Sequence, residues 1–224
     1  MEQIKPYPLP IENQLPVSAA DWLLDHNRTA LLIHDMQHYF LSFFTAETSP
    51  LVHVINNTHR LLTVARSLNI PVFYTAQPGD MTPQQRGLLL NLWGPGMNAT
   101  PEHKQIISQL MPQSNEHVFT KWRYSAFFNS PLLPTLRELK RDQLIISGVY
   151  AHIGCLCTAQ EAYSNDIETF FISDAVADFS EEKHHLALEL AAETSSVVLS
   201  TRQAINTLER NNSSFRNIGE HDVI

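Results

Sequence analysis

The chain has 224 residues, of which 43% are hydrophobic and 17% charged, a composition typical of a globular protein with one large core. Its net charge of -8 argues against nucleic acid as the main partner, because phosphate binding needs clustered lysines and arginines. No apolar run approaches the roughly 18 residues that span a membrane, so we expect no membrane segment.

The N-terminal stretch and the cysteines indicate where the protein works. MEQIKPYPLPIENQLP lacks the apolar core and the small-residue cleavage site of a secretion signal. Cys155 and Cys157 are the only cysteines, and two positions apart on a helix they cannot easily form a disulfide. Two unpaired thiols are typical of a reducing compartment, so the sequence predicts a cytoplasmic protein.

Short β-rich runs alternate with amphipathic stretches along the chain. The run TALLIHD at 29–35 is almost entirely apolar until its polar end, which is typical of a strand buried on both faces. Apolar residues at helical spacing predict a helix over 49–68, and a loop containing glycine and proline covers 78–100. Further strands are predicted at 72–77, 117–121, 143–150, 169–176 and 197–201, and further helices at 130–140, 151–165, 181–195 and after 201 to about Arg210.

Six strands that alternate with helices predict an α/β fold. The expected architecture is a three-layer, doubly wound sandwich of Rossmann-like type with a six-stranded, mainly parallel sheet. We expect a single domain over residues 1–210. The last stretch, 211–224, is polar and aperiodic and predicts a C-terminal tail.

Polar side chains end five of the predicted strands. In sheets of this kind, ligands bind beyond the carboxyl ends of the strands, so these side chains should gather at one rim. Strand ends are also polar for solubility alone, and that alternative stays open. The residues concerned are Asp35, Gln77, Lys121, Tyr150 and Asp174.

The segment SGVYAHIGCLC at 147–157 raises the question of a nucleophile. A cysteine between a strand and the start of a helix lies where backbone N–H groups and the helix dipole favour a thiolate. On this interpretation Cys155 makes the protein a cysteine hydrolase. The alternative is that Cys155 and Cys157 are small residues of the core.

Several strings resemble the isochorismatase family, in the same order and spacing, from about residue 5 to residue 205. TKWRYSAF and GVYAHIG are the most specific, and they resemble the branch that acts on isochorismate-type substrates. The resemblance implies an isochorismatase-like fold and a hydrolase without a cofactor. The strings are HDMQHYF (34–40), YTAQPGDM (74–81), LLLNLWGPGM (88–97), TKWRYSAF (120–127), SGVYAHIGC (147–155) and DAVADFS (174–180).

The resemblance also bears on the nucleophile. In the cysteine hydrolases of the wider family, the cysteine lies six positions after the glycine that ends a strand. Counted from Gly148, that position is Gly154, and Cys155 lies one residue later, about 100° around a helix. The resemblance therefore implies the branch that lacks the nucleophile. Its reaction protonates a vinyl ether at carbon, lets water capture the oxocarbenium ion and releases pyruvate.

Asp35 and Lys121 are the catalytic residues that the resemblance implies, with Asp35 as the acid. The apolar residues before Asp35 predict a pKa raised by desolvation, whereas a nearby Lys121 would lower it. A substrate carboxylate that pairs with Lys121 would offset that effect. We therefore expect the protonation of Asp35 to depend on bound substrate.

An anionic small molecule is the expected partner, and the resemblance implies the residues that bind it. Arg86 would pair with a carboxylate, and Tyr150 and the backbone N–H of Gly154 would bind the enolpyruvyl carboxylate. A side chain at Gly154 would intrude on that space, and a non-proline cis peptide bond is expected near Tyr150. The full set of binding residues is Gln77, Arg86, Tyr150, Gly154, Trp93 and Phe40.

Other features are given structural roles. The Asp-x-His pattern of nicotinamidases is absent after Asp35, so we expect no metal. GPG at 94–96 predicts a hinged or tightly turned lid in the loop 78–100, and the dimers of relatives imply a homodimer. Four further candidates are expected only to pack or to face solvent: Trp122 and Tyr124 in the first case, His184 and His185 in the second.

Two substrates fit the resemblance. MTPQQRGLL, KWRYSAFFNS and AYSNDI resemble the phenazine-pathway branch, which converts 2-amino-2-deoxyisochorismate to trans-2,3-dihydro-3-hydroxyanthranilate. GVYAHIGC resembles the siderophore-pathway isochorismatases, which give 2,3-dihydro-2,3-dihydroxybenzoate and often carry a carrier domain that we do not expect here. The balance favours the amino substrate. Isochorismate is the alternative, and a cysteine amidase of the same fold is a distant one.

Overall fold

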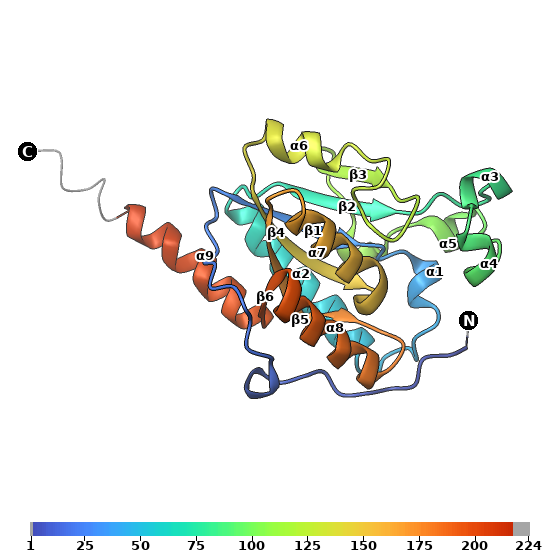
Figure 1. Cartoon of the computed structure of the whole chain (residues 1–224), viewed down its shortest axis with the longest axis horizontal. Helices are drawn as coiled ribbons and strands as arrows, with labels where there is room; N and C mark the ends of the chain where they lie inside the picture. Colours follow the sequence, from blue (N-terminus) through green and yellow to red (C-terminus); the bar gives the residue numbers. More distant parts are fainter. Residues whose placement is uncertain (1, 217–224) are drawn as a thin grey trace, which may run out of the picture.

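The core of the protein is a single sheet of six parallel strands. The computed structural model describes residues 2–216, with the backbone alone for 211–216. The strand order is β3-β2-β1-β4-β5-β6, and each neighbouring pair is parallel (Figure 1). The predicted α/β class and its six strands are confirmed. The strands are β1 Thr29–His34, β2 Val72–Ala76, β3 His117–Thr120, β4 Gln143–Val149, β5 Glu168–Ala177 and β6 Ser196–Leu199.

Helices cover both faces of the sheet. Helices α2 and α9 contribute apolar residues to one core cluster, and α6, α7 and α8 contribute to the other. The α-helices are α1 His38–Leu41, α2 Leu51–Ser67, α3 Pro83–Arg86, α4 Leu89–Trp93, α5 Pro101–Lys104, α6 Leu132–Glu138, α7 Leu156–Tyr163, α8 Glu181–Thr194 and α9 Thr201–Arg216. Short 3-10 turns are η1 Glu12–Gln14 and η2 Ser108–Leu110, and η3 Ala151–Cys155 is a π-helical turn.

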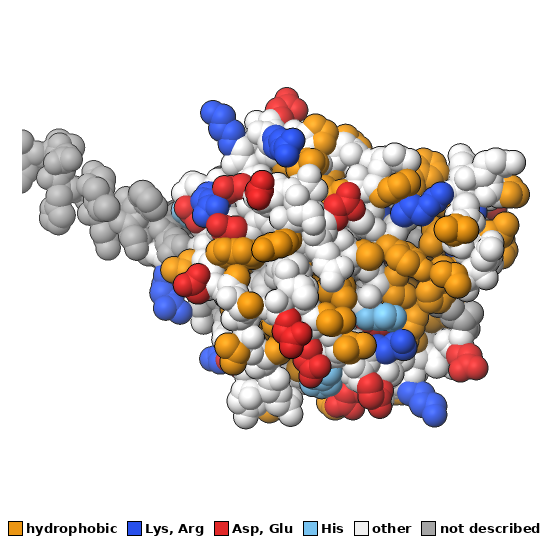
Figure 2. Space-filling model, viewed as in Figure 1, with side chains coloured by type: hydrophobic (Ala, Val, Ile, Leu, Met, Phe, Trp, Pro, Cys, Tyr) orange, Lys and Arg blue, Asp and Glu red, His pale blue; other side chains and the backbone are white. Residues whose placement is uncertain are grey.

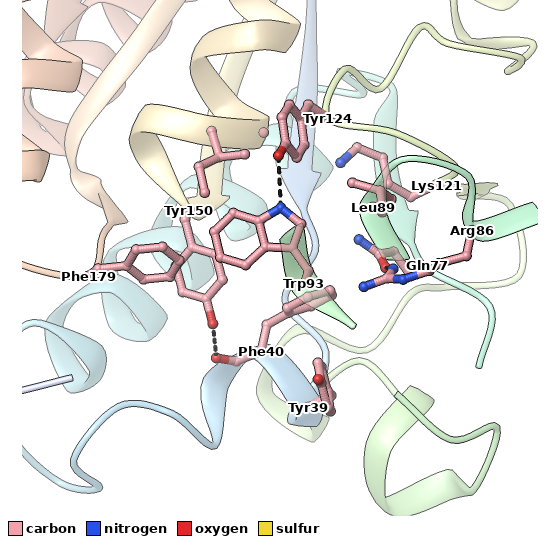
Figure 3. A pocket seen from close by; sticks show the side chains of 12 residues that line it. Tyr39, Phe40, Gln77, Arg86, Leu89, Trp93, Lys121, Tyr124, Tyr150 and Phe179 are labelled. Atoms are coloured by element: carbon pink, nitrogen blue, oxygen red, sulfur yellow. Dashed lines mark hydrogen bonds between the residues drawn. The ribbon is translucent and has the colours of Figure 1, made fainter. Parts of the chain in front are cut away.

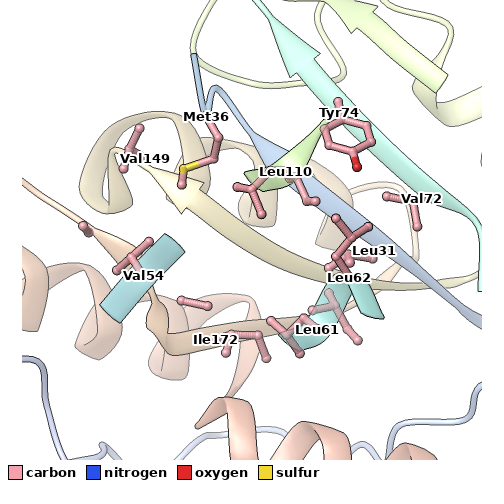
Figure 4. Close-up of a cluster of buried hydrophobic side chains, with 14 of the residues drawn as sticks. Leu31, Met36, Val54, Leu61, Leu62, Val72, Tyr74, Leu110, Val149 and Ile172 are labelled. Carbon is pink, nitrogen blue, oxygen red and sulfur yellow. The ribbon is translucent and has the colours of Figure 1, made fainter. Parts of the chain in front are cut away.

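The two core clusters explain why the strands are apolar without alternation. Leu31 and Ile33 of β1 point into the cluster under α2, whereas Ala30 and Leu32 point to the opposite face. Because helices cover both faces, every residue of β1 is buried. Figure 4 shows the first cluster, in which Leu61 of α2 lies among side chains of the strands.

Some boundaries differ from the sequence predictions. Helix α9 continues through Arg216, past its predicted end at Arg210, and the remaining part of the predicted tail, 217–224, lies outside the described residues. The predicted loop 78–100 contains the helices α3 and α4. Within the described chain, no helix is both long and apolar enough to cross a membrane.

The strand order fixes where a ligand site forms. The chain leaves β1 towards β2 and β3 on one side of the sheet, and continues from β4 to β6 on the other side. The carboxyl ends of β1 and β4 therefore meet at the point where the winding reverses, which is the usual ligand site of such sheets. Asp35 directly follows β1, and Tyr150 directly follows β4.

His184 on α8 is buried, which corrects the expectation that it faces solvent. Its Nε2 donates a hydrogen bond to the carbonyl of Ser173 at 2.9 Å, and its Nδ1 lies 3.2 Å from the hydroxyl of Tyr7. Burial lowers the pKa of His184 to about 4. The next residue, His185, keeps 37% of its side chain exposed.

We predict that His184 destabilises the fold in acid. Its pKa falls from 6.5 in the unfolded chain to about 4 in the folded one, so the unfolded state binds the extra proton between these values. The free energy of unfolding should lose about 3 kcal/mol from this group between pH 7 and pH 4. Urea titrations of wild type and His184→Gln measure it, and the variant should lose less. His185→Gln is the matched control, and an equal pH dependence of all three proteins would contradict the prediction.

Candidate active site

A buried carboxylate–ammonium pair lies at the carboxyl ends of β1 and β3. Lys121 Nζ is 3.2 Å from Asp35 Oδ2, and both side chains are more than nine-tenths buried. Thr75 of β2, the strand between them, donates its hydroxyl to Asp35 Oδ1 at 2.5 Å. The same hydroxyl accepts the backbone N–H of Asp35 at 3.1 Å. Three adjacent strands therefore hold the two predicted catalytic residues together.

The pKa of Asp35 is lowered in the protein. Burial acts to raise it, as expected from the sequence, but His34, Lys121 and the hydrogen bond from Thr75 outweigh burial. The expectation of a raised pKa is therefore wrong for the protein without substrate. Asp35 is a carboxylate at neutral pH, and any role as an acid requires that its surroundings change.

A pocket opens beside this pair (Figure 3). Lys121 lines the pocket, whereas Asp35 lies one hydrogen bond behind Lys121 and does not line it. The lining residues are Tyr39, Phe40, Gln77, Arg86, Leu89, Trp93, Lys121, Tyr124, Tyr150, Ile153, Gly154 and Phe179.

Arg86 is a second, buried cation in the pocket. Its Nε donates to the carbonyl of Gly94 at 2.9 Å, and one Nη donates to Gln77 Oε1 at 3.1 Å. The structure gives it no carboxylate partner within the described residues, although it is only 5% exposed. Gly96 has a φ of +84°, and a Cβ there would lie 2.9 Å from Arg86 Cζ, so the predicted GPG turn fits around the guanidinium.

Gln37 holds the side of the pocket that contains Gln77 and Arg86, and the sequence analysis did not identify it as a site residue. Its Nε2 donates to the carbonyls of Gln77 and Lys104, at 2.9 and 2.7 Å, and its Oε1 accepts the N–H of Gln77 at 2.8 Å. It is fully buried, so these bonds fix the loop after β2. The sequence offered one sign of this role: Gln37 comes two residues after Asp35, which follows the end of a strand.

Aromatic side chains form the rest of the pocket wall. Trp93 Nε1 donates a hydrogen bond to the hydroxyl of Tyr124 at 2.8 Å. Tyr124 was expected only to pack in the interior, but it lines the pocket. Phe179 lies 4.4 Å from Tyr150 and 6.0 Å from Trp93, ring centre to ring centre. Tyr39 and Phe179 were both missed by the sequence analysis, although each lies inside or next to a quoted motif.

Tyr150 lines the pocket, and its hydroxyl is bonded within the protein. Its hydroxyl donates to the carbonyl of Phe40 at 2.7 Å, and burial raises its pKa, so it presents a neutral ring to the pocket. The expected non-proline cis bond is confirmed between Val149 and Tyr150. The π-helical turn η3 follows directly and brings Gly154 to the pocket surface.

The group next to Gly154 is the ring of His34, whereas the sequence analysis expected the space there to hold the substrate. A Cβ at this position would lie 2.3 Å from Cε1 and 2.7 Å from Nε2 of His34. The space beside Gly154 is thus already filled by a side chain of the protein, so a side chain there would strike His34 before it reached a substrate.

Two sequence candidates lie away from the pocket. Asp174 belongs to β5, which runs on to Ala177, and its Oδ1 accepts both the N–H and the hydroxyl of Thr201 at 2.7 Å. The expectation that Asp174 joins the rim is therefore wrong. Cys155 is fully buried in the core, and burial raises its thiol pKa well above the usual range. Such a thiol is a poor nucleophile, as the core interpretation implies.

Metal-ligating side chains do not gather anywhere in residues 2–210, the part of the chain whose side chains the structure describes. Groups of three or more histidine, cysteine, aspartate or glutamate side chains with suitable geometry are absent from this part of the chain.

The family model of the isochorismatase domain matches residues 29–203, most of the chain. The chain belongs to the isochorismatase family. It is 48% identical over 206 residues to the isochorismatase of Bacillus subtilis, with 92% of this chain and 66% of that protein covered, just under two thirds of its length. It is 47% identical over 202 residues to the phenazine biosynthesis protein PhzD of Pseudomonas fluorescens, with 90% and 97% covered.

A solved structure supports the fold of this isochorismatase-family hydrolase. A cysteine hydrolase from Pseudomonas syringae pv. phaseolicola matches with a TM-score of 0.77 at 22% identity, over 88% of this chain and 98% of that one. The predicted family, fold and hydrolase class are confirmed. The roles of the individual site residues stay predictions.

We predict that Lys121 holds Asp35 in its ionised form. In Lys121→Met the desolvation of Asp35 persists and one of the groups that oppose it is gone, so the pKa of Asp35 should rise from its lowered value. Carbon-detected NMR titration of the aspartate carboxyl groups measures this shift. Lys104→Met removes an exposed lysine of α5 and should leave Asp35 unchanged. An unaltered titration in Lys121→Met would show that the ion pair does not control the carboxyl group.

Proposed function

We propose that the protein hydrolyses the enolpyruvyl vinyl ether of an isochorismate-type substrate and releases pyruvate. The observation that carries this proposal is a buried Asp35–Lys121 pair beside a pocket without a thiol or aliphatic hydroxyl nucleophile. Among the described residues, no serine, threonine or cysteine lines that pocket. A cysteine amidase would need Cys155, which is buried in the core with a raised pKa.

The charge of the pocket suits a substrate with carboxylates. Arg86 is buried, and nothing anionic in the described chain neutralises it. A planar guanidinium can bind a carboxylate through two parallel hydrogen bonds. Such a ligand would repay the cost of keeping an unpaired cation inside the protein. The net charge of -8 makes this local attraction more necessary.

The chemistry requires a proton donor and stabilisation of positive charge. Asp35 gives a proton to the terminal methylene carbon of the enolpyruvyl group, which leaves an oxocarbenium ion on the adjacent carbon. Water adds to that carbon and returns a proton to Asp35, and the hemiketal then collapses to pyruvate and the ring alcohol. The faces of the aromatic rings around the pocket are suited to stabilise the cation.

Substrate binding supplies the change of surroundings that Asp35 needs. The Lys121 ammonium lies between Asp35 and the pocket, and a substrate carboxylate attracts it away from Asp35. Loss of this partner and the nearby negative charge both raise the pKa of Asp35. The bound substrate thus creates the acid that cleaves it.

The preferred substrate in this proposal is 2-amino-2-deoxyisochorismate, which gives trans-2,3-dihydro-3-hydroxyanthranilate. The similarity to PhzD over 97% of that protein supports this choice. Isochorismate, which gives 2,3-dihydro-2,3-dihydroxybenzoate, is the alternative, supported by the similarity to the Bacillus subtilis isochorismatase. A homodimer, a cytoplasmic location and a single domain over 1–210 are further parts of the proposal.

Asp35→Asn should reduce kcat by about 1000-fold, because an amide cannot deliver the proton. In wild type, log kcat/KM should fall with a slope near -1 from pH 6 to pH 8. Since the pKa of Asp35 is lowered in the free enzyme, each added pH unit removes nine-tenths of its protonated form. Asp174→Asn, at an acid outside the pocket, is the control and should keep wild-type rates. Undiminished turnover by Asp35→Asn would remove Asp35 from the mechanism.

The substrate is decided by pyruvate release from isochorismate and from 2-amino-2-deoxyisochorismate, with a chelator present. We expect turnover of both, with a higher kcat/KM for the amino substrate. A preference for isochorismate would select the alternative product. Pyruvate from neither substrate would refute vinyl ether hydrolysis and return attention to the cysteines.

A further inference from the structure

His34, the last residue of β1, is a buried histidine that the mechanism above does not use. Its side chain is 1% exposed, and its Nδ1 donates to the carbonyl of Val149 at 2.7 Å. A carbonyl can only accept, so this bond places the ring proton on Nδ1 and leaves a lone pair on Nε2. Nε2 is buried and has no partner at full hydrogen-bonding geometry among the described residues, and the backbone of Tyr124 also lies near the ring.

The ring of His34 lies against Gly154. The three nearest atoms to a Cβ built at this glycine all belong to the ring: Cε1 at 2.3 Å, Nε2 at 2.7 Å and Nδ1 at 3.3 Å. The distances to Cε1 and Nε2 are too short for any Cβ, so the ring in this position and a side chain at 154 exclude each other. The ring cannot retreat without loss of its bond to Val149, because the buried carbonyl would then lack a partner.

The same ring also borders the catalytic pair. Nδ1 of His34 is 3.8 Å from Asp35 Oδ2. This is the same carboxylate oxygen that contacts Lys121. Burial lowers the pKa of His34 to about 4, so the ring is uncharged at neutral pH. Lys121 is then the cation nearest to Asp35 within the described chain, and its movement changes the charge around Asp35.

We propose that His34 is a positioning residue that excludes every side chain from position 154 and holds Asp35 in place, so that His34 determines which chemistry this pocket supports. A nucleophile at 154 requires a smaller residue at 34. The catalytic part of this inference rests on the proposed function, whereas the steric part does not.

The test is a double-mutant cycle between the two positions. His34→Asn places an amide N–H near the position of Nδ1, so it can still bond Val149, but it lacks the atoms that a Cβ at 154 would strike. Melting temperature and kcat are measured for wild type, His34→Asn, Gly154→Ala and the double variant. The penalty of Gly154→Ala on kcat should be at least tenfold smaller in the His34→Asn background, and its loss in melting temperature should shrink as well.

Gly148 provides a matched control for this cycle. A Cβ at Gly148 would lie 2.1 Å from the backbone oxygen of His34, not from its ring, and its φ is +118°. Gly148→Ala should therefore cost the same with or without His34→Asn. Rescue at 154 but not at 148 would identify the ring as the obstacle.

A positioning role also predicts a particular kinetic change. Because His34 does not line the pocket, His34→Asn alone should lower kcat about tenfold and leave KM within twofold of wild type. Equal penalties of Gly154→Ala in both backgrounds, or failure of the double variant to fold, would overturn the steric part. Wild-type kcat in His34→Asn would overturn the positioning part. If neither substrate is turned over, the melting temperatures still decide the steric part.

Discussion

The structure depends on the burial of one carboxylate with one ammonium group at the end of a parallel sheet. Breaking such a pair costs several kcal/mol, because an uncompensated charge then stays in the interior. Asp35 and Lys121 follow strands that are two places apart, and Thr75 lies on the strand between. The pair therefore requires a register in which the carboxyl ends of β1, β2 and β3 lie side by side. The register that buries the apolar faces of the strands also assembles the site.

The pocket concentrates positive charge inside an acidic protein. Lys121 and Arg86 are both buried there, and only Lys121 has a carboxylate partner in the described chain. Hydrogen bonds hold Arg86 through Gly94 and Gln77, and Gln77 is held in turn by Gln37. The segment with α3 and α4 thus owes part of its shape to the same guanidinium that faces the pocket. Binding and order of this segment are coupled through one side chain.

The sequence predicted the fold well because the signal was local. Strands buried on both faces are apolar runs, and the polar residue after each run marks its end, as at Asp35. The sequence-based prediction failed for residues whose positions depend on packing between distant parts of the chain. Asp174 lies inside β5 because that strand shifts register past Ile146 and extends to Ala177, and Phe179 meets the pocket only through the following turn. The lowered pKa of Asp35 likewise depends on three groups that only the tertiary structure brings together.

The contact between His34 and Gly154 has an evolutionary consequence. In our proposal, two chemistries of one fold are separated by two positions that lie 120 residues apart in the chain and meet at the ring of His34. A thiol introduced first at 154 meets the imidazole, whereas a smaller residue at 34 only leaves space. The path from one chemistry to the other therefore has a preferred order, with residue 34 changing first.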